Sequence, residues 1–317
     1  MTYVLLLVGF ALLIKGADYF VKGASQIAEN LQVSPLLVGL TIVAFGTSSP
    51  EATVSITAAL EDNAGVALGN VVGSNIFNIT FVIGLTALIA PLKVETETIR
   101  KEIPFTLLAG IALLILMSDA VLQTASTNII TRSDGFVLLL FFAVFLYYIF
   151  EVARRDRSAQ TVQETTEGKV WGKYIFLTIL GLAAIIFGGD LVVGSASEIA
   201  VSFGMSTTLV GLTIVAVGTS LPELITSVTA ALKKEGGIAI GNIVGSNIFN
   251  IFFVLGAASA VSPLAVDSKV FFDIILMIIL TVVLLVFSRT SYTIGRKEGV
   301  TLAAAYILYM IYIIIRN

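Results

Sequence analysis

Long runs of apolar residues, separated by short polar stretches, follow one another along the whole chain. One helical crossing of a lipid bilayer takes about 20 apolar residues, so runs of this length predict membrane-spanning helices. The runs are continuous rather than alternating, which favours helices over a β-barrel. The pattern predicts ten helices, covering residues 2–28, 35–60, 66–90, 103–120, 134–152, 173–200, 206–232, 238–261, 270–288 and 298–316. The first run has no basic segment before it and no obvious cleavage site, so we expect a retained helix rather than a signal peptide.

The composition agrees with this pattern. Of the 317 residues, 57% are hydrophobic and 12% are charged, whereas a soluble domain carries about 25% charged residues. The chain contains no His and no Cys. Zinc hydrolases, Ser-His-Asp and Cys-His catalysis, His-ligated haem and disulfide chemistry are therefore excluded. We expect an all-α integral membrane protein that is not an enzyme, with the lipid bilayer as a partner and no nucleic acid.

The chain contains an internal repeat at a fixed offset of 172 residues. The segment GLTIVAFGTSSPEATVSITAAL, from Gly39, returns from Gly211 with 16 identities in 22 positions. The segment LGNVVGSNIFNITFVIG, from Leu68, returns from Ile240 with 13 identities in 17. Repeats of this length indicate duplicated structural units. We expect an N-terminal five-helix repeat over 1–152, a polar linker over 153–172 and a C-terminal five-helix repeat over 173–317.

Five helices per repeat is an odd number, so the second repeat must enter the membrane inverted. Lys and Arg should then collect on the cytoplasmic face. The face that carries the linker holds Lys93, Arg100, Lys101, Arg154, Arg155, Arg157, Lys169, Lys173, Lys233, Lys234, Arg289, Arg296 and Lys297. The opposite face holds only Arg132, Lys269 and Arg316. We therefore expect a multi-pass protein of the cell membrane with a cytoplasmic linker and both termini outside.

One pair of loops supports the inversion. Glu61 and Asp62 follow the second predicted helix, and their partners at the repeat offset are Lys233 and Lys234. The apolar sequence is thus duplicated while the loop charge changes sign. Inverted repeats are typical of secondary transporters that work by alternating access, with the substrate site near the bilayer midplane. The first and sixth helices, rich in small residues, are candidates for the sliding elements.

Two carboxylates stand in the middle of apolar helices, within AFGTSSPE and AVGTSLPE. Glu51 and Glu223 each need a proton or a cation, because a charge inside the bilayer is costly. Pro50 and Pro222 supply no N–H, so each helix should break or kink beside its carboxylate. Hydroxyl groups at i−4 and i−3 share the face of each Glu; they belong to Thr47, Ser48, Thr219 and Ser220. Carboxylate, hydroxyl and carbonyl oxygens suit hard cations such as Na⁺ and Ca²⁺.

The second motif adds a polar stripe to the next helix of each repeat. The stripe contains Asn70, Ser74 and Asn78, and it returns as Asn242, Ser246 and Asn250. Its oxygens would complete a coordination shell between the repeats, although Asn70 and Asn242 suit capping or interhelical bonds equally well. Gly69, Gly73, Gly241 and Gly245 have the small-xxx-small spacing that allows close helix packing. Asp18 and Asp190 would either hold partner helices or line an access path.

GTSSPE and GTSLPE, each followed by GNVVGSNIFN or GNIVGSNIFN, resemble the paired α-repeats of the calcium/cation antiporter superfamily, most closely the prokaryotic sodium/calcium exchangers. The resemblance implies that Glu51 and Glu223 ligate Ca²⁺ and that Thr47 and Thr219 contribute backbone carbonyls. It implies overlapping Na⁺ sites completed by Ser48, Ser220, Ser74, Ser246, Asn78 and Asn250. Some relatives, including K⁺-dependent exchangers, carry Asp where this chain has Asn250, so the formal charge of this site is −2.

These observations predict a Na⁺/Ca²⁺ antiporter in which the two ions compete for shared ligands. Ca²⁺ and Na⁺ would bind as transported substrates, with no cofactor, and the sequence indicates no protein partner. One alternative is an H⁺/Ca²⁺ or K⁺-dependent Na⁺/Ca²⁺ antiporter that uses the same two Glu residues. A cation channel with the two Glu as a filter is another, disfavoured by the duplicated, Pro-broken helices.

Overall fold

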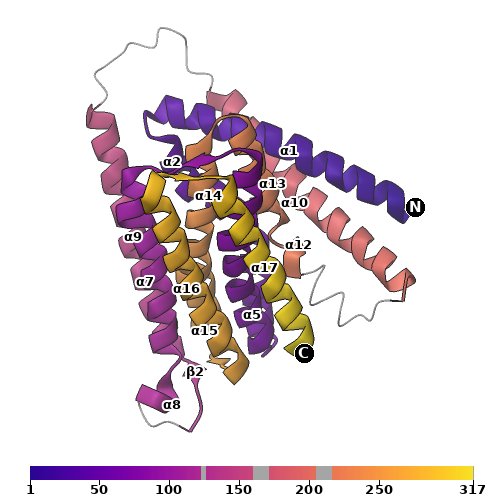
Figure 1. Ribbon diagram of the computed structural model, residues 1–317, viewed down its shortest axis with the longest axis vertical. Coiled ribbons are helices and arrows are strands. Elements are labelled where there is room, and N and C mark those ends of the chain that lie inside the picture. Colours follow the sequence, from indigo (N-terminus) through magenta and orange to yellow (C-terminus); the bar gives the residue numbers. More distant parts are fainter. Residues whose placement is uncertain (123–125, 160–170, 205–215, 317) are drawn as a thin grey trace.

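The computed structural model describes residues 1–122, 126–159, 171–204 and 216–316, and these form a helical bundle (Figure 1). The helices of the first half are α1 (Thr2–Leu31), α2 (Pro35–Val38), α3 (Ala44–Thr47), α4 (Ser49–Leu60), α5 (Ala64–Phe77), α6 (Ile83–Ile89), α7 (Ile103–Leu116), α8 (Asp119–Leu122) and α9 (Arg132–Ala159). Those of the second half are α10 (Trp171–Ser202), α12 (Ala216–Gly218), α13 (Leu221–Leu232), α14 (Gly236–Ile248), α15 (Gly256–Val261), α16 (Ser268–Ser291) and α17 (Arg296–Arg316).

Within the described residues, seven helical segments are long and apolar enough to cross a membrane. They match seven of the ten predicted helices; two of them, Ala64–Ile89 and Gly236–Val261, are central and mostly buried. The segment predicted over 35–60 is interrupted at Ser48, and α7 spans only 14 residues. Residues 206–215 of the helix predicted over 206–232, and residues 160–170 of the predicted linker, lie outside the described residues.

Within the described part of the chain, the structure differs from the sequence expectations in four π-helical turns and two helix boundaries. The π-helical turns are η1 (Gly39–Val43), η2 (Asn78–Val82), η3 (Thr98–Glu102) and η5 (Phe249–Leu255). The helix predicted over 103–120 ends at Leu116, where the Ser118 hydroxyl donates to the Leu114 carbonyl at 2.5 Å. The helix predicted over 134–152 continues to Ala159, because contacts of Arg155 with Glu97 and of Asp156 with Ser34 hold its end.

Two short antiparallel pairings join the halves of the chain. β1 (Leu92–Lys93) pairs with β4 (Thr293–Ile294), and β2 (Ile129–Ile130) pairs with β3 (Leu264–Ala265). Because β3 precedes α16 and β4 follows it, the two pairings lie at opposite ends of the bundle (Figure 1). With the packing of α7 against α16, α6 against α17 and α9 against α15, they bind helices of both halves into one scaffold.

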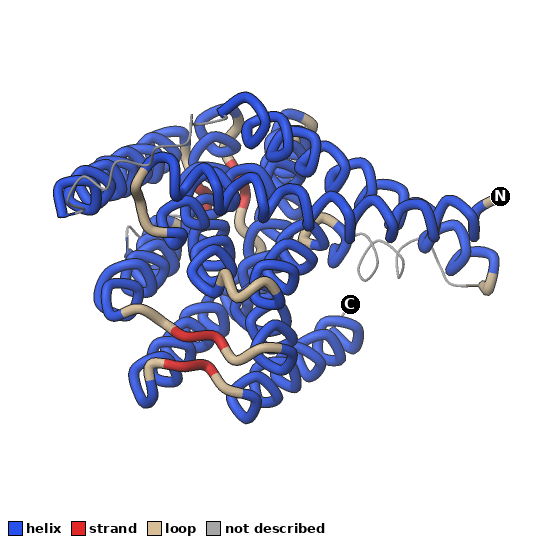
Figure 2. The backbone as a smooth tube through the Cα atoms, turned by 90° about the horizontal axis from the view of Figure 1, so that it is seen from above, coloured by secondary structure: helices blue, strands red, loops and turns tan. Residues whose placement is uncertain are grey.

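The long helices α1 and α10 pack along each other and extend from one side of this scaffold (Figures 1 and 2). Glycines allow the close approach. A Cβ atom added to Gly188 would lie 2.9 Å from the Gly9 carbonyl oxygen, and one added to Gly16 would lie 2.9 Å from the Gly181 carbonyl oxygen. Small residues let helix backbones meet in this way inside membranes. The α1–α10 pair therefore forms its own closely packed unit.

The close packing predicts opposite effects for two glycines of α10. Gly188→Ala should lower the free energy of unfolding by about 1–3 kcal/mol through overpacking. Gly194→Ala should leave it unchanged or raise it by up to about 1 kcal/mol, because Ala favours the helix and no atom lies within 4 Å of the added Cβ. Thermal unfolding in detergent tests both variants. Equal stabilities would contradict the packing described for α1 and α10.

Candidate functional site

Each repeat has a helix break directly before its buried carboxylate. α3 ends at Thr47, Ser48 adopts φ −84° and ψ 9°, and α4 begins at Ser49 with Pro50 in its first turn. In the second repeat, Ser220 has φ −93° and ψ 8°, and α13 starts with Pro222 in its first turn. The predicted breaks at the two prolines are therefore confirmed. They place Glu51 and Glu223 in the first turns of helices, where the positive end of the helix dipole favours negative charge.

The two breaks face each other across the interface between the repeats. The Ser48 hydroxyl donates to Glu223 Oε1 at 2.7 Å, and the Ser220 hydroxyl donates to Glu51 Oε1 at 2.9 Å. All four side chains have 0% exposure. Each carboxylate is thus held by a hydroxyl of the other repeat, and the folded chain brings together four residues that are far apart in sequence.

Asn70 and Asn242 support the breaks from the neighbouring helices α5 and α14. The Asn242 amide nitrogen donates to the Glu223 carbonyl at 3.3 Å and to the Ser227 hydroxyl at 2.9 Å. The equivalent bonds of Asn70, to Glu51 and Ser55, have the same lengths. Both asparagines therefore make the interhelical bonds that the sequence left open as an alternative to ligation.

The threonines of the two breaks turn their hydroxyls toward these asparagines. Thr47 donates to Asn242 Oδ1 at 2.9 Å, and Thr219 donates to Asn70 Oδ1 at 3.4 Å. These bonds fix the orientation of both threonines beside the breaks. The resemblance implied the backbone carbonyl oxygen of each threonine as its cation ligand.

The polar stripe contributes Ser74 from α5, Asn78 at the start of η2, Ser246 from α14 and Asn250 within η5. π-Helical turns inside α-helices are frequent at functional sites, because they shift the register of the side chains. All four side chains are buried, and the Ser246 hydroxyl lies 3.5 Å from Glu223 Oε1. The structure thus places Ser246 beside the carboxylate of the second break.

Two residues that the sequence did not single out orient the amides of this stripe. The Asn78 amide nitrogen donates to Asn247 Oδ1 at 3.2 Å, and the Asn250 amide nitrogen donates to Asn75 Oδ1 at 3.2 Å. Asn75 also donates to the Asn247 carbonyl at 3.2 Å. The signal in the sequence was the pentapeptide SNIFN, which occurs unchanged in both repeats with its two Asn residues at i and i+3.

Several oxygens of the site are buried and have no hydrogen-bond partner. They are Glu51 Oε2, Glu223 Oε2, Ser74 Oγ, Asn78 Oδ1 and Asn250 Oδ1. Buried polar atoms without partners cost about 1–3 kcal/mol each, so a group of five calls for an explanation. Oxygens of these types are the ligands of hard cations, and Ca²⁺ takes 6–8 of them. Among the described residues no third carboxylate joins Glu51 and Glu223 in a metal-binding group.

For the small-xxx-small glycines, the structure describes the packing partners of the pair in the second repeat, Gly241 and Gly245. A Cβ added to Gly241 would lie 2.5 Å from the Leu36 carbonyl oxygen, and one added to Gly245 would lie 2.8 Å from Leu40 Cα. The predicted close approach of α14 to α2 and η1 is therefore confirmed. The segment equivalent to α2 and η1, expected beside Gly69 and Gly73, falls at 207–215, outside the described residues.

Comparisons with known proteins give one consistent result. The model of the family described as sodium/calcium exchanger protein matches residues 1–151 and 173–315. CaxA, a proposed antiporter of Alkalimonas amylolytica, is 42% identical over 96% of each chain. The sodium/calcium exchanger MaX1 of Methanosarcina acetivorans is 34% identical over 98% of this chain and 97% of its own. Among solved structures, the sodium-calcium exchanger NCX_Mj matches with a TM-score of 0.84 and 32% identity, covering 97% of both chains.

The amide contacts predict a role for Asn75 in cation affinity. Asn75→Ala removes the acceptor that orients the Asn250 amide, and loss of such supporting hydrogen bonds weakens metal binding by about 10–100-fold. Binding of ⁴⁵Ca²⁺ to the purified protein in detergent measures the change. The control is Asn63→Ala, which removes an exposed helix cap at the start of α5 and should leave the affinity unchanged. Equal affinities of the two variants would argue against the orienting role.

Proposed function

The chain belongs to the sodium/calcium exchanger protein family, and from this premise we propose that it exchanges Na⁺ for Ca²⁺ across the cell membrane by alternating access. The observation that carries the proposal is the group of unpartnered oxygens around two buried carboxylates. Ca²⁺ and Na⁺ bind there as substrates, and no cofactor takes part. The proposed ligand set consists of Glu51, Glu223, Ser48, Ser220, Ser74, Ser246, Asn78, Asn250 and the carbonyls of Thr47 and Thr219.

Charge balance explains how one site couples the two fluxes. The two carboxylates carry a formal charge of −2, which one Ca²⁺ or two Na⁺ neutralises. An ion-free site leaves both charges in a medium of low dielectric constant, which is strongly unfavourable. The carrier therefore changes sides only when loaded, and competition for the same oxygens prevents the passage of one ion without the return of the other.

The neutral oxygens favour Na⁺ over H⁺ as the coupling ion. A proton can replace Ca²⁺ on a carboxylate, but it does not satisfy the Asn78 and Asn250 amide oxygens. Those oxygens are buried and oriented by hydrogen bonds through their own nitrogens. Na⁺, a hard cation, binds neutral oxygens together with carboxylates. The composition of the site thus supports Na⁺/Ca²⁺ exchange over H⁺/Ca²⁺ exchange.

The proposed architecture is ten membrane-spanning helices in two inverted five-helix repeats, with a cytoplasmic linker and both termini outside. The turns after α4 and α13 support the duplication. Asp62 and Lys234 occupy the same position in these turns, with φ values of 56° and 64°. The backbone is thus the same in both turns while the charge is opposite, as expected if one turn faces the outside and the other faces the cytoplasm.

We infer that the α1–α10 pair moves against the scaffold during the exchange cycle. In the structure the pair is tied to one end of the scaffold by side chains of α1. Lys233 Nζ lies 2.7 Å from Asp18 Oδ1, and the Ser25 hydroxyl donates to Glu235 Oε1 at 2.6 Å. At the equivalent position of the other repeat, Asp190 corresponds to Asp18 and Glu61 to Lys233. Asp190 and Glu61 are both negative, which disfavours a second contact of this kind. The contacts of α1 with Lys233 and Glu235 therefore hold one orientation of the α1–α10 pair.

Replacing either carboxylate should abolish exchange. Glu51→Gln or Glu223→Gln removes one charge from a site that needs both to neutralise Ca²⁺. In proteoliposomes loaded with Na⁺, uptake of ⁴⁵Ca²⁺ by these variants should fall to the level of protein-free vesicles. The control, Glu151→Gln, replaces an exposed carboxylate near the end of α9 and should retain full uptake.

The same vesicles distinguish the possible coupling ions. Loading with choline instead of Na⁺ should eliminate uptake by the unaltered protein, and an outwardly directed H⁺ gradient should not restore it. Uptake driven by the H⁺ gradient alone would establish H⁺/Ca²⁺ exchange instead. Uptake that survives Glu51→Gln and Glu223→Gln would overturn the assignment of the site.

Cross-linking tests the inferred movement, because the chain has no native Cys. Asp18→Cys combined with Lys233→Cys, joined by a short thiol cross-linker, should stop ⁴⁵Ca²⁺ uptake, and reduction should restore it. The matched control joins Asp273→Cys to Arg316→Cys, an ion pair at 3.0 Å between α16 and α17. That link lies within the scaffold and should leave uptake intact. Full uptake by the cross-linked Asp18→Cys/Lys233→Cys protein would contradict the movement of α1.

A further inference from the structure

The long helices α1 and α10 make unequal contacts with the rest of the bundle. Lys233 Nζ lies 2.7 Å from Asp18 Oδ1 and 2.8 Å from the Asp18 carbonyl oxygen. The Ser25 hydroxyl donates to Glu235 Oε1 at 2.6 Å, and α1 packs against α13. We call these interactions of α1 with α13 and with the following turn, residues 233–235, the α1 contact. They hold the middle of α1 against the second repeat.

The internal repeat defines an equivalent contact, which is not formed in the described part of the chain. At the offset of 172 residues, it would join α10 to the turn after α4 through Asp190, Ser197 and Glu61. We call this approach the α10 contact. Asp190 and Glu61 are exposed, and neither belongs to an ion pair between described residues. α10 and α4, as far as they are described, do not pack together in the way that α1 and α13 do.

Ser197 is left without a partner in this arrangement. Its hydroxyl oxygen is buried and has no hydrogen-bond partner, although a Ser in a helix can bond to a carbonyl of the preceding turn. A buried hydroxyl without a partner is unfavourable. Ser25, the equivalent residue of α1, has its partner through the α1 contact. Ser197 would gain a partner in the same way if α10 approached the turn after α4.

The two contacts differ in the sign of their charges. The α1 contact combines four positive groups with two negative ones, whereas the α10 contact would bring together carboxylates alone. The groups of the α1 contact are Lys15, Asp18, Lys22, Lys233, Lys234 and Glu235, and the charged residues at the equivalent positions are Asp190, Glu61 and Asp62. Like charges repel when they approach each other. The α10 contact therefore lacks the cation that stabilises the α1 contact.

We propose that the α1 contact and the α10 contact form in turn as the α1–α10 pair moves, and that the charge of residue 61 keeps the α10 contact the less populated of the two. Inverted repeats allow two orientations of a moving bundle around a fixed site, and exchanging the roles of the repeats converts one contact into the other. The proposal rests on the movement inferred above for the α1–α10 pair but not on the identity of the transported ions.

A pair of cysteines reports on the α10 contact without changing its charges, because the chain has no native Cys. The pair is Ser197→Cys with Asn63→Cys, at the positions equivalent to Ser25 and Glu235. The purified full-length protein in detergent is treated with a short thiol cross-linker. Intact-mass spectrometry separates bridged protein from protein that carries two unlinked labels. The rate of bridging then measures how often the α10 contact forms.

Three substitutions in this reporter protein change the charges of the two contacts. Lys233→Gln removes the ion pair of the α1 contact, and Glu61→Gln removes one of the repelling carboxylates. Each should speed bridging by about two- to fivefold, the effect expected for partly exposed charges. Glu61→Lys supplies the missing counterpart of Lys233 and should give the fastest bridging of the three.

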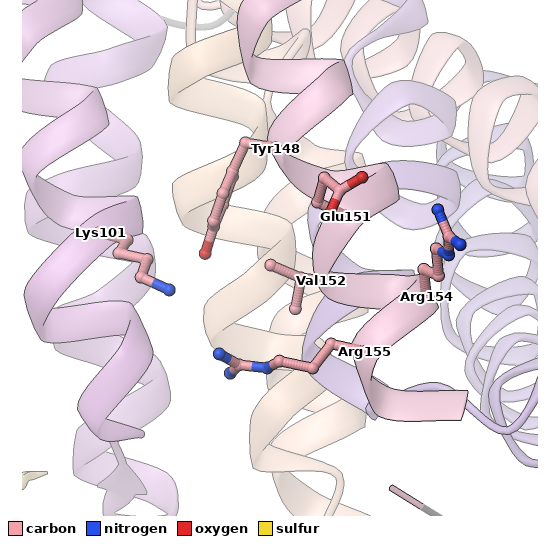
Figure 3. A pocket seen from close by; sticks show the side chains of 6 residues that line it. All are labelled: Lys101, Tyr148, Glu151, Val152, Arg154 and Arg155. Atoms are coloured by element: carbon pink, nitrogen blue, oxygen red, sulfur yellow. The ribbon is translucent and has the colours of Figure 1, made fainter. Parts of the chain in front are cut away.

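Lys101→Gln is the matched control for Lys233→Gln. Lys101 Nζ lies 2.6 Å from Glu97 Oε2, so this variant also removes an ion pair of a partly exposed Lys. Figure 3 shows Lys101 on one helix, facing Tyr148 and Arg155 of α9, within the scaffold and not on the α1–α10 pair. The variant should therefore bridge at the rate of the unaltered reporter protein.

The rates have outcomes that would overturn the proposal. Equal bridging in Lys233→Gln and Lys101→Gln would show that the α1 contact does not oppose the α10 contact. Slower bridging in Glu61→Lys than in Glu61→Gln would show that residue 61 does not act through its charge. No bridging in any variant that still binds ⁴⁵Ca²⁺ would show that the α10 contact does not form. Charge-dependent bridging in a protein without Na⁺-driven ⁴⁵Ca²⁺ uptake would support this proposal while contradicting the proposed exchange.

Discussion

Two carboxylates with no exposure to solvent, Glu51 and Glu223, impose the main constraint on this bundle. Each lies in the first turn of a helix, directly after a break and a proline, so that the positive end of the helix dipole is beside the charge. Each carboxylate also accepts a hydrogen bond from a hydroxyl of the opposite repeat. The second oxygen of each carboxylate has no hydrogen-bond partner, so in the proposed site it is available to a cation. In the proposed mechanism, the cost of burying these charges makes the site bind ions and couples binding to movement.

The asparagines around the carboxylates show how a polar centre persists inside an apolar protein. Every amide nitrogen of Asn70, Asn78, Asn242 and Asn250 has an acceptor, while the oxygens of Asn78 and Asn250 remain free. In the proposed site, the amide nitrogens make structural hydrogen bonds and the amide oxygens of Asn78 and Asn250 are available to a cation. This division requires two partners, Asn75 and Asn247, that contact no carboxylate in the hydrogen bonds described. The hydrogen bonds of the amide nitrogens fix the side-chain positions, which the proposed site for a small cation needs.

The internal duplication is symmetric at the site and asymmetric at the surface. The hydrogen bonds of Ser48 and Asn70 beside the proposed cation site return at Ser220 and Asn242 with closely similar lengths. The turns after α4 and α13 share a backbone conformation but carry opposite charges. Only the turn with Lys233 forms an ion pair with a long helix, through Asp18 on α1, among the pairs resolved in the described residues. In the proposed exchange cycle, the symmetric ligands allow the site to face either side, and the asymmetric charges select which side the structure presents.

The sequence by itself determined the membrane setting, the duplication, the helix breaks and the residue types of the site, because each follows from local composition, spacing or the chemistry of proline. Seven of the ten predicted helices recur among the described residues as long apolar helices. Only the tertiary structure decided the pairings: Ser48 with Glu223, Ser220 with Glu51, and Asn75 with Asn250. The positions of the π-helical turns were also beyond the sequence. These features depend on contacts between residues that are distant along the chain, and no local pattern specifies which distant groups will meet.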